Sequence, residues 1–367
     1  MIKAAIVGCG KIADAHAAAI SMVPDSEIVG VCDSELLMAK QLFERFPIKG
    51  YYGDLREMLG AAKPTVVHIT TPPQSHLDIA KTCLDSGCHV YVEKPFTVNA
   101  KEARQLIQTA EQNRLKLTVG TDEQFSLTAI RTRQLVQQGY LGGPPVHMEA
   151  YYCYDLGEEQ YAKAFLANKT HWLRNLPGQL LHNIISHGLA KIVEYLDGED
   201  LKVVAHGFTS DFLRKMGETS LIDELRVILD DGQKRTAYFT FSTQMRPLLR
   251  EFRIYGRRNG LIVNQDNHSL IKVPGSSYKS VLNAVIPLNT YAREYRKSMF
   301  SNIRLFLKRD FHMKSGLKRL IESFYRSISQ DTPLPIPTKQ ILMTVEIMDT
   351  IFDQLRDQDA RSFLADR

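Results

Sequence analysis

The first sixteen residues, MIKAAIVGCGKIADAH, constrain the fold of this chain more than any other stretch. Ile2 to Val7 is a short apolar run with three β-branched residues, which predicts one buried strand. Gly8, Gly10 and Ala13 follow as G-x-G-x-x-A, and apolar residues continue beyond them with helical spacing. In such a strand–turn–helix, one glycine permits the turn, the next lets the backbone approach a pyrophosphate, and the helix N-terminus favours negative charge. The start of the chain therefore predicts a dinucleotide-binding unit.

Asp33 makes this prediction more specific. It stands twenty residues after Ala13, at the end of a second apolar run, Ile28 to Cys32. An acid at this point can accept hydrogen bonds from both hydroxyls of an adenosine ribose and would repel a 2′-phosphate. The pattern therefore favours NAD over NADP. The alternative is a tight strand–helix turn that binds no nucleotide.

Strand-like and helix-like segments alternate through the first third of the chain, which predicts a doubly wound α/β domain over residues 1–121. Its sheet should be parallel, covered by helices on both faces, with ligands beyond the carboxyl ends of the strands. Asn99 is a plausible cap for the last helix of this part. The further expected strands are 64–70, 89–92 and 115–120, and the expected helices are 36–46, 73–86 and 99–113.

From residue 122 the pattern changes, and residues 122–367 are expected to form a second, α+β domain for substrate binding and oligomerisation. Two helices, 127–138 and 180–196, are followed by strand-like runs without helices between them, which predicts a mostly antiparallel sheet with one open face. Dimerisation is a common cover for such a face. The expected strands are 146–154, 201–209, 222–229, 235–243 and 250–255, with turns at 230–232 and 258–260 and a final helix over 338–355.

Composition is that of an ordinary soluble protein, with 44% hydrophobic and 24% charged residues. We see neither a secretory signal nor an apolar run of membrane-spanning length, and we expect a cytoplasmic protein. The five cysteines have no zinc spacing, so we expect buried, reduced thiols and no metal. The formal net charge is +5, but residues 291–319 alone carry nine basic and two acidic side chains. The rest of the chain is therefore slightly acidic, which argues against a nucleic-acid partner.

The basic segment combines its charge with an apolar stripe formed by Met299, Phe300, Ile303, Phe306 and Leu307. It could be an interfacial membrane helix or a docking site for an anionic, nucleotide-linked substrate. The preferred interpretation is a helix that packs its stripe on the domain and leaves a solvated basic face.

Further motifs lie at expected strand ends and in the second domain. Thr71-Pro72-Pro73-Gln74-Ser75-His76 follows one strand and Glu93-Lys94-Pro95 follows the next, while Pro177-Gly178-Gln179-Leu180-Leu181 leads to His187. With the glycine turn and His16, these motifs resemble the glucose–fructose oxidoreductase/inositol dehydrogenase (Gfo/Idh/MocA) family over nearly the whole chain. The resemblance implies NAD(P)-linked hydride transfer on sugars, polyols or sugar nucleotides, and a homodimer or homotetramer built on the open sheet.

The resemblance also implies roles for individual residues. Lys94 would hydrogen-bond the reacting hydroxyl, and its bond to Pro95 is often cis in the family. His187 would accept the hydroxyl proton, with substrate between the two. The residues expected to bind the cofactor are Gly8, Gly10, Lys11, Ile12, Asp33, Thr71, Pro72, His76, Glu93, Lys94, Trp172 and Arg174. Those expected to bind substrate are Lys94, Gln124, Tyr152, Asn183 and His187.

The chain also departs from the family pattern. Asn183 and Ala190 stand where the family often has aspartates, and Thr121 to Phe125 replaces a run that contains arginine. An asparagine can orient an imidazole but cannot stabilise an imidazolium by charge. Two alternatives therefore stay open, which are NAD-dependent glycoside hydrolysis with a transient hydride transfer, and a redox-silent NAD-binding regulatory module.

Overall fold

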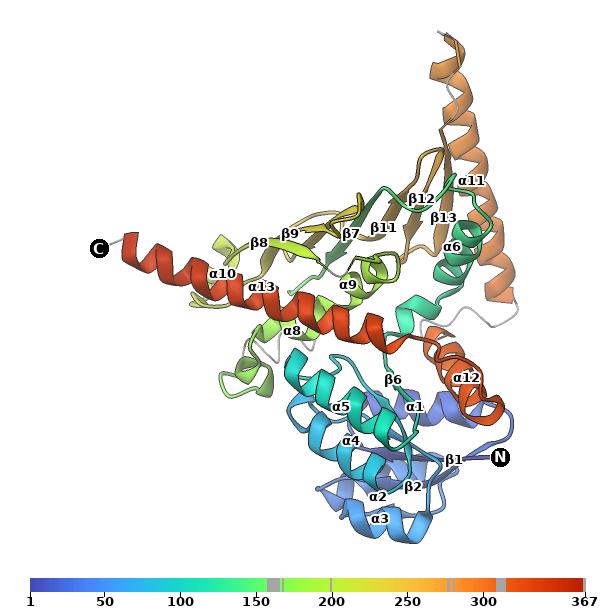
Figure 1. Ribbon diagram of the computed structural model, residues 1–367, viewed down its shortest axis with the longest axis vertical. Coiled ribbons are helices and arrows are strands. Elements are labelled where there is room, and N and C mark those ends of the chain that lie inside the picture. The colour runs from blue at the N-terminus through green and yellow to red at the C-terminus, as the bar shows by residue number, and fades with distance from the viewer. Residues whose placement is uncertain are drawn as a thin grey trace. The chain divides into compact units, whose positions relative to one another are not determined.

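The computed structural model describes residues 1–156, 166, 168–198, 200–275, 278–279, 281–307 and 315–365. The chain divides into two compact units (Figure 1), the first formed by Met1–Phe125 and Lys314–Glu346 and the second by Ser126–Met313 and Ile347–Arg367. The chain therefore returns to the first unit near its end. The sequence-based division at residue 121 placed this returning segment in the second domain, so the two descriptions differ there.

The first unit contains a six-stranded parallel sheet in the order β3-β2-β1-β4-β5-β6. Order reverses at β1, so the carboxyl ends of β1 and β4 flank the crevice where such sheets bind ligands. The predicted α/β class is confirmed. The strands are β1 (Ile2–Val7), β2 (Ser26–Cys32), β3 (Tyr51–Tyr52), β4 (Val66–Ile69), β5 (His89–Val92) and β6 (Leu117–Val119).

Helices connect these strands, as the alternation predicted. Asn99 caps its helix, because its side chain accepts a hydrogen bond from the N–H of Glu102 at 2.9 Å. The helices of the first 125 residues are α1 (Lys11–Ser21), α2 (Leu36–Arg45), α3 (Leu55–Ala62), α4 (His76–Asp85) and α5 (Ala100–Gln112), with short 3₁₀ turns η1 (Pro73–Ser75) and η2 (Asp122–Phe125). The returning segment adds α12 (Ser315–Gln330) and the first part of α13 (Thr338–Ala365).

The second unit contains a seven-stranded sheet in the order β13-β12-β11-β7-β10-β9-β8. All neighbours are antiparallel except β7 and β10, which are parallel, so the predicted mostly antiparallel class is confirmed. The last two strands were missed by the sequence analysis. The strands are β7 (His147–Cys153), β8 (Lys202–Phe208), β9 (Glu224–Asp230), β10 (Thr236–Ser242), β11 (Arg250–Tyr255), β12 (Asn259–Asn264) and β13 (Ser269–Pro274).

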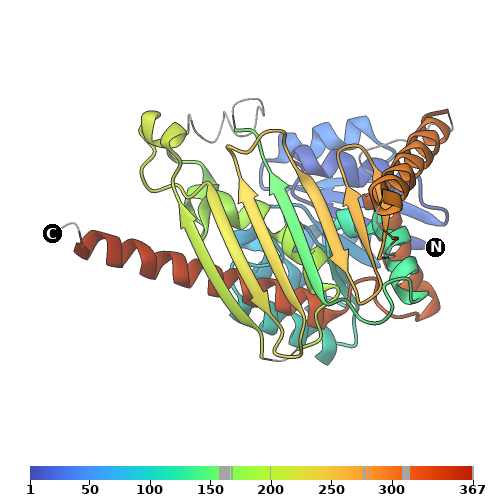
Figure 2. The same cartoon turned by 90° about the horizontal axis from the view of Figure 1, so that it is seen from above.

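One face of this second sheet is packed and the other is open. A helix lies against β7 and β10 on the packed face, where Phe239 and Phe241 are fully buried. On the opposite face Val204, Ile228 and Tyr238 are paired across β8, β9 and β10, and each side chain is at least half exposed. Figure 2 shows this face of the sheet without a covering helix.

The helix expected over residues 180–196 is two short helices, α8 (Gln179–Ile184) and α9 (Ser186–Val193), which meet at Ile185. Gly188 lets α9 approach the sheet, because a Cβ at this position would meet the ring of Phe239 at 2.3 Å. The other helices of this unit are α6 (Leu127–Gln137), η3 (Trp172–Asn175), α10 (Asp211–Lys215), α11 (Val281–Leu307) and the later part of α13.

The structure corrects the interpretation of the basic segment. Met299, Phe300, Ile303, Phe306 and Leu307 were expected to pack on the domain, but their side chains are 47–75% exposed on α11. Residues 308–314, with Lys308, Arg309 and Lys314, lie outside the described residues. In the part of the chain that the structure describes, no helix has the length and apolar character needed to cross a membrane.

Candidate active site

The glycine turn after β1 has the geometry that a dinucleotide requires. Gly8 has φ +91°, and a Cβ there would meet the side chain of Thr71 at 2.6 Å, so the position needs glycine. Gly10 is the N-cap of α1, and a Cβ there would meet nothing within 4 Å. The N-terminus of α1 thus opens onto free space without a capping side chain, as a phosphate site needs.

Asp33 is joined to this turn by hydrogen bonds. Its Oδ2 accepts from the N–H of Cys9 at 2.7 Å, and its Oδ1 accepts from the N–H of Glu35 at 2.9 Å. A carboxylate has about four acceptor positions, so both oxygens can still accept from ribose hydroxyls. Ser34 and Glu35 are exposed and bring no positive charge for a 2′-phosphate. The residues present therefore fit NAD.

His76 connects the loops that follow β4 and β5. Its Nε2 lies 2.8 Å from the carbonyl oxygen of Thr71, and its Nδ1 lies 3.1 Å from that of Phe96. Burial lowers the pKa of His76, and the two carbonyl contacts oppose this effect only in part. The imidazole therefore holds the T-P-x-x-x-H loop beside the strand end that carries Lys94.

A buried hydrogen-bond chain runs behind Lys94, and the sequence analysis missed most of it. His16 Nε2 lies 2.9 Å from Glu93 Oε1, His16 Nδ1 lies 2.9 Å from His68 Nδ1, and His68 Nε2 lies 2.8 Å from the hydroxyl of Tyr325. Burial and the neighbouring His16 lower the pKa of His68 well below its usual range, so His68 is neutral. Because neutral His68 carries one ring proton, one of its ring nitrogens donates and the other accepts, so His68 can link His16 to Tyr325 in either proton order.

Lys94 stands at the end of β5 among carboxylates. Burial lowers its pKa, while Glu93, Asp122 and Glu123 oppose that shift. The peptide bond between Lys94 and Pro95 is cis. Gly120 leaves room for the Glu93 carboxylate, because a Cβ on this glycine would meet Glu93 Oε1 at 2.5 Å.

Asp122 is an acid of this group whose pKa is strongly raised. Burial, followed by the charges of Glu123 and Glu93, raises its pKa to about 7. Beside it, the hydroxyl of Thr121 donates to the side chain of buried Gln124 at 2.7 Å. The end of β6 thus supplies a group that titrates near neutral pH close to Lys94.

In the second unit, His187 and Tyr152 are brought together. Their rings stack with centroids 5.4 Å apart and an angle of 4° between the planes. The ammonium of Lys191 and the guanidinium of Arg250 lie 5.6 and 5.4 Å from the centre of the Tyr152 ring. Tyr152 is buried, whereas His187 and Asn183 are half-buried. This cluster carries hydrogen-bonding and cationic groups suited to a hydroxylated ligand.

Trp172 and Arg174 lie on η3, and Arg174 is held by an acid that the sequence analysis missed. Arg174 donates to both oxygens of Glu218, at 3.2 and 2.8 Å. The hydrogen bond from Arg174 is the main reason that the pKa of Glu218 is lowered. No motif indicated this pair, because 44 residues separate its members.

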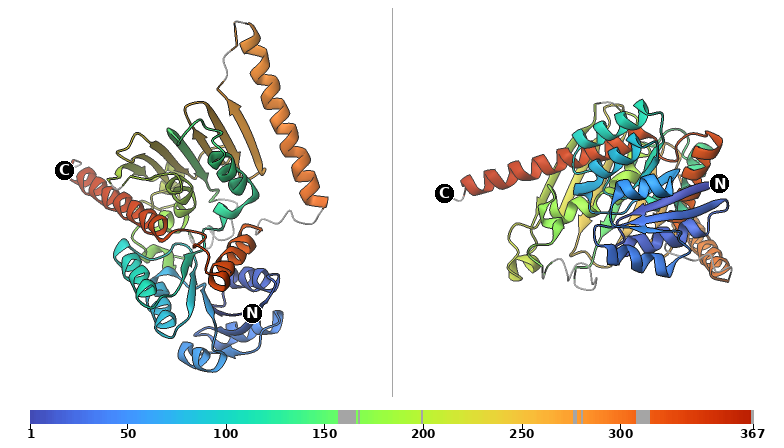
Figure 3. Two further views of the ribbon diagram at one scale, coloured as in Figure 1. Left: turned by 45° about the vertical axis from the view of Figure 1, so that its right-hand side comes forward. Right: turned by 90° about the horizontal axis from the view of Figure 1, so that it is seen from below.

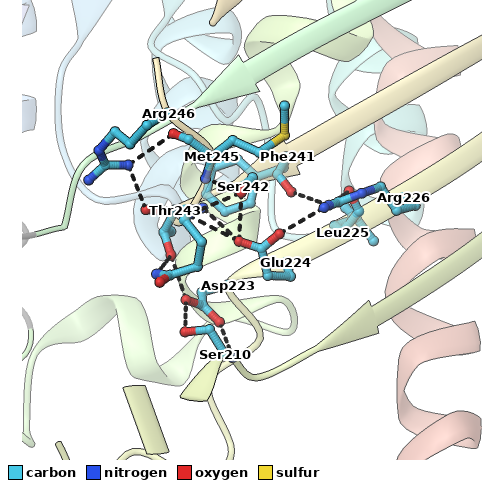
Figure 4. Close-up of polar contacts among 11 residues, drawn as sticks. Ser210, Asp223, Glu224, Leu225, Arg226, Phe241, Ser242, Thr243, Met245 and Arg246 are labelled. Carbon is cyan, nitrogen blue, oxygen red and sulfur yellow. Dashed lines mark hydrogen bonds and ion pairs between the residues drawn. The ribbon is translucent and has the colours of Figure 1, made fainter. Parts of the chain in front are cut away.

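A second buried polar cluster, at the start of β9, holds the fold rather than a ligand (Figure 4). Asp223 accepts hydrogen bonds from Ser210 and Thr243, and Glu224 accepts from Ser242, Thr243, Gln244 and Arg226. These bonds occupy both carboxylates within the fold. In the described residues, no group of three or more His, Cys, Asp or Glu side chains is arranged to hold a metal ion.

The predicted site residues thus fall into two sets, each described within its own unit. The first unit holds the glycine turn with Lys11 and Ile12, Asp33, the loop from Thr71 and Pro72 to His76, Glu93, Lys94 and Gln124. The second unit holds Tyr152, Trp172, Arg174, Asn183 and His187.

Residues 2–121 match the family described as "Oxidoreductase family, NAD-binding Rossmann fold". These residues therefore resemble the NAD-binding domain of that oxidoreductase family. This family domain includes every predicted site residue of the first unit except Gln124.

Named relatives extend the likeness over part of the second unit. The chain is 34% identical over 142 residues to D-glucoside 3-dehydrogenase of Escherichia coli (strain K12), covering 38% of this chain and 40% of that protein. It is 26% identical over 184 residues to inositol 2-dehydrogenase of Salmonella typhimurium (strain LT2), covering 47% of this chain and 55% of that protein. The chain thus matches about half the length of these relatives.

The fold resembles solved structures over nearly the whole chain. The UDP-N-acetylglucosamine 3-dehydrogenase GnnA from Acidithiobacillus ferrooxidans superposes with a TM-score of 0.73 and 18% identity, over 96% of this chain and 97% of that one. At this identity the likeness shows the fold alone, and it extends to the second unit.

Proposed function

We propose that the protein is an NAD-dependent oxidoreductase that acts on a secondary alcohol or ketone of a sugar, polyol or sugar nucleotide. The observation that carries the proposal is the hydrogen bond between the glycine turn and the Asp33 carboxylate, in a domain that matches the NAD-binding oxidoreductase family. The substrate class follows the names of the similar proteins, which are dehydrogenases of a glucoside, an inositol and a UDP-sugar.

The reaction needs a hydrogen-bond donor and a proton acceptor for the reacting hydroxyl. NAD, when bound, supplies the acceptor for the hydride that leaves the carbon. We assign Lys94 as the donor that holds the hydroxyl oxygen, and His187 as the base that removes the hydroxyl proton. In the reverse direction, His187 returns this proton to the ketone oxygen.

Further residues bind and orient the reactants in this proposal. Tyr152 stacks on His187 and would fix the plane of the imidazole, while Asn183 and Gln124 offer amide groups to substrate hydroxyls. Trp172 and Arg174 would contact the cofactor near its nicotinamide end, with Glu218 fixing the guanidinium.

The first experiment is a scan of sugars, inositols and sugar nucleotides for NADH formation. With a substrate in hand, Lys94→Ala and His187→Ala should each lower kcat by about a hundred- to ten-thousand-fold, because each removes a positioned donor or base. NADH affinity, measured by calorimetry, should change little. Lys101→Ala, an exposed lysine on α5, is the matched control and should keep full activity.

Near-wild-type kcat in both variants would reject the assigned roles. NADH binding without turnover of any compound in the scan would instead favour the redox-silent regulatory module. Release of an aglycone from a glycoside without net NADH formation would favour the hydrolase.

The open face of the second sheet also belongs to this proposal. We propose that a second copy of the chain covers it, giving a homodimer or a homotetramer. A cytoplasmic location agrees with the five cysteines, all of which are free and buried.

A further inference from the structure

Helix α11 turns its polar side toward strand β13, within the second unit. Glu294 is buried on that side, Asn302 donates to the carbonyl of Asn267 at 2.7 Å, and Ser298 accepts from the N–H of Leu270 at 3.4 Å. These bonds fix α11 along β13, at one edge of the second sheet (Figures 1 and 3). Figure 1 also shows α11 extending past the end of that sheet.

An exposed side of α11, next to the side that is bonded to β13, is apolar over most of the helix. Its residues are separated by three, four or seven positions, so they share one face of the helix. Their exposed fractions are far above those of a packed helix face. This apolar face comprises Val285 (59%), Leu288 (67%), Tyr295 (54%), Met299 (48%), Ile303 (47%) and Phe306 (71%), with Phe300 (63%) at its margin.

Basic side chains border the apolar face. Arg293, Arg296, Lys297 and Arg304 are all exposed. The single acidic residue of α11 is Glu294, which is buried and bonded to Lys297 at 2.5 Å. The exposed surface of this helix therefore combines large apolar and aromatic groups with the positive charge of Arg293, Arg296 and Arg304, which no acidic residue of α11 compensates.

We propose that α11 docks on the surface of a lipid bilayer that contains anionic headgroups. Aromatic and aliphatic side chains on one face, with Arg and Lys beside them, are the pattern of helices that lie in the headgroup region. The basic residues match anionic lipid, whereas pairing α11 with the same helix of a second copy would bring like charges together. The inference is independent of the proposed chemistry, because it uses no residue of the candidate active site.

Sedimentation of the full chain with lipid vesicles tests this inference. We expect binding to phosphatidylcholine vesicles that contain phosphatidylglycerol, weak binding to phosphatidylcholine alone, and weakening as salt is raised. Arg296→Gln with Arg304→Gln should reduce binding by about 25-fold, since each cation near an anionic surface contributes about fivefold. Ile303→Asp with Phe306→Asp should abolish binding.

The matched control replaces two exposed methionines outside α11, Met22→Asp with Met216→Asp, and should bind vesicles like the wild type. Circular dichroism and NADH calorimetry establish that each variant is folded. Equal binding to neutral vesicles, or wild-type binding by Ile303→Asp with Phe306→Asp, would overturn the proposal. The proposal would also be overturned if the wild type formed an oligomer and bound no vesicles, while Ile303→Asp with Phe306→Asp was a monomer. A second copy of the chain would then cover the apolar face.

Discussion

At the scale of single residues, Asp33 decides which cofactor the first unit accepts. Its carboxylate is fixed by the N–H groups of Cys9 and Glu35, and no basic residue follows it. We expect NADH to bind more tightly than NADPH. Asp33→Asn should weaken NADH binding by about ten- to a hundred-fold, because hydrogen bonds to a charged group contribute roughly 1.5–3 kcal/mol.

Calorimetry with both cofactors measures this preference. Asp25→Asn is the matched control, because Asp25 is exposed and its positive φ suits asparagine. Equal or tighter binding of NADPH by the wild type would refute the role given to Asp33.

Asp122 should make stability depend on pH. Its pKa is raised from 3.8 to about 7, so the folded state binds a proton between these values that the unfolded state has released. This contribution to stability is therefore complete below about pH 4 and is lost as the pH rises through 7. Because the side chain is half-buried, we expect a loss on the order of 1–3 kcal/mol.

Melting temperatures of the wild type and Asp122→Asn between pH 4 and 8 give the measurement. The variant should be more stable relative to the wild type at pH 8 than at pH 5, since asparagine does not ionise. A difference that is constant with pH would mean that Asp122 keeps an ordinary pKa.

At the scale of elements, the hydrogen bond between Tyr325 of α12 and His68 of β4 anchors the buried chain that leads to Glu93, next to Lys94. Tyr325→Phe removes the partner of fully buried His68 and should cost about 1–3 kcal/mol of unfolding free energy. Tyr91→Phe is the matched control. The Tyr91 hydroxyl is also buried, but it has no hydrogen-bond partner among the described residues, so its removal should be neutral or stabilising. Denaturant unfolding measures the free energy of unfolding of both variants. Equal losses of stability would contradict the hydrogen bond between Tyr325 and His68.

Sequence patterns predicted several elements whose cause is local. Asn99 caps its helix, the glycine turn follows β1, and Pro337 directly precedes α13. They could not predict the bond between His68 and Tyr325, whose members are 257 residues apart. The division of α8 from α9 was missed as well, because the apolar spacing continues through Ile185.

At the scale of the whole molecule, the class of each sheet followed from the sequence but the path of the chain did not. Residues 314–346 return to the first unit through contacts such as Lys116 with the carbonyl of Thr332, at 2.9 Å. The candidate site residues divide in the same way, into those that a local motif locates and those that depend on contacts between distant parts of the chain. Those at strand ends, such as Asp33 and Lys94, could be located from their motifs, whereas Tyr325 and Glu218 depend on contacts that only the folded chain makes.

The open face of the second sheet leads to a prediction about assembly. Val204, Ile228 and Tyr238 are cross-strand neighbours and at least half exposed, and Arg253 and Glu149 form an ion pair on the same sheet. Apolar groups bordered by charged pairs are typical of a protein interface. We therefore expect light scattering to find an oligomer at micromolar concentration.

Ile228→Asp with Tyr238→Asp should convert this oligomer to a monomer. Burying each side chain contributes about 1.5–3 kcal/mol, so losing two of them on each copy costs a dimer about 6–12 kcal/mol, which is comparable to the roughly 8 kcal/mol that holds a micromolar dimer together. Ile303→Asp with Phe306→Asp on α11 is the matched control and should leave the mass unchanged, because that face is assigned to lipid. A wild-type monomer would exclude assembly on this sheet, and a monomer from the α11 variant alone would place the interface on α11 instead.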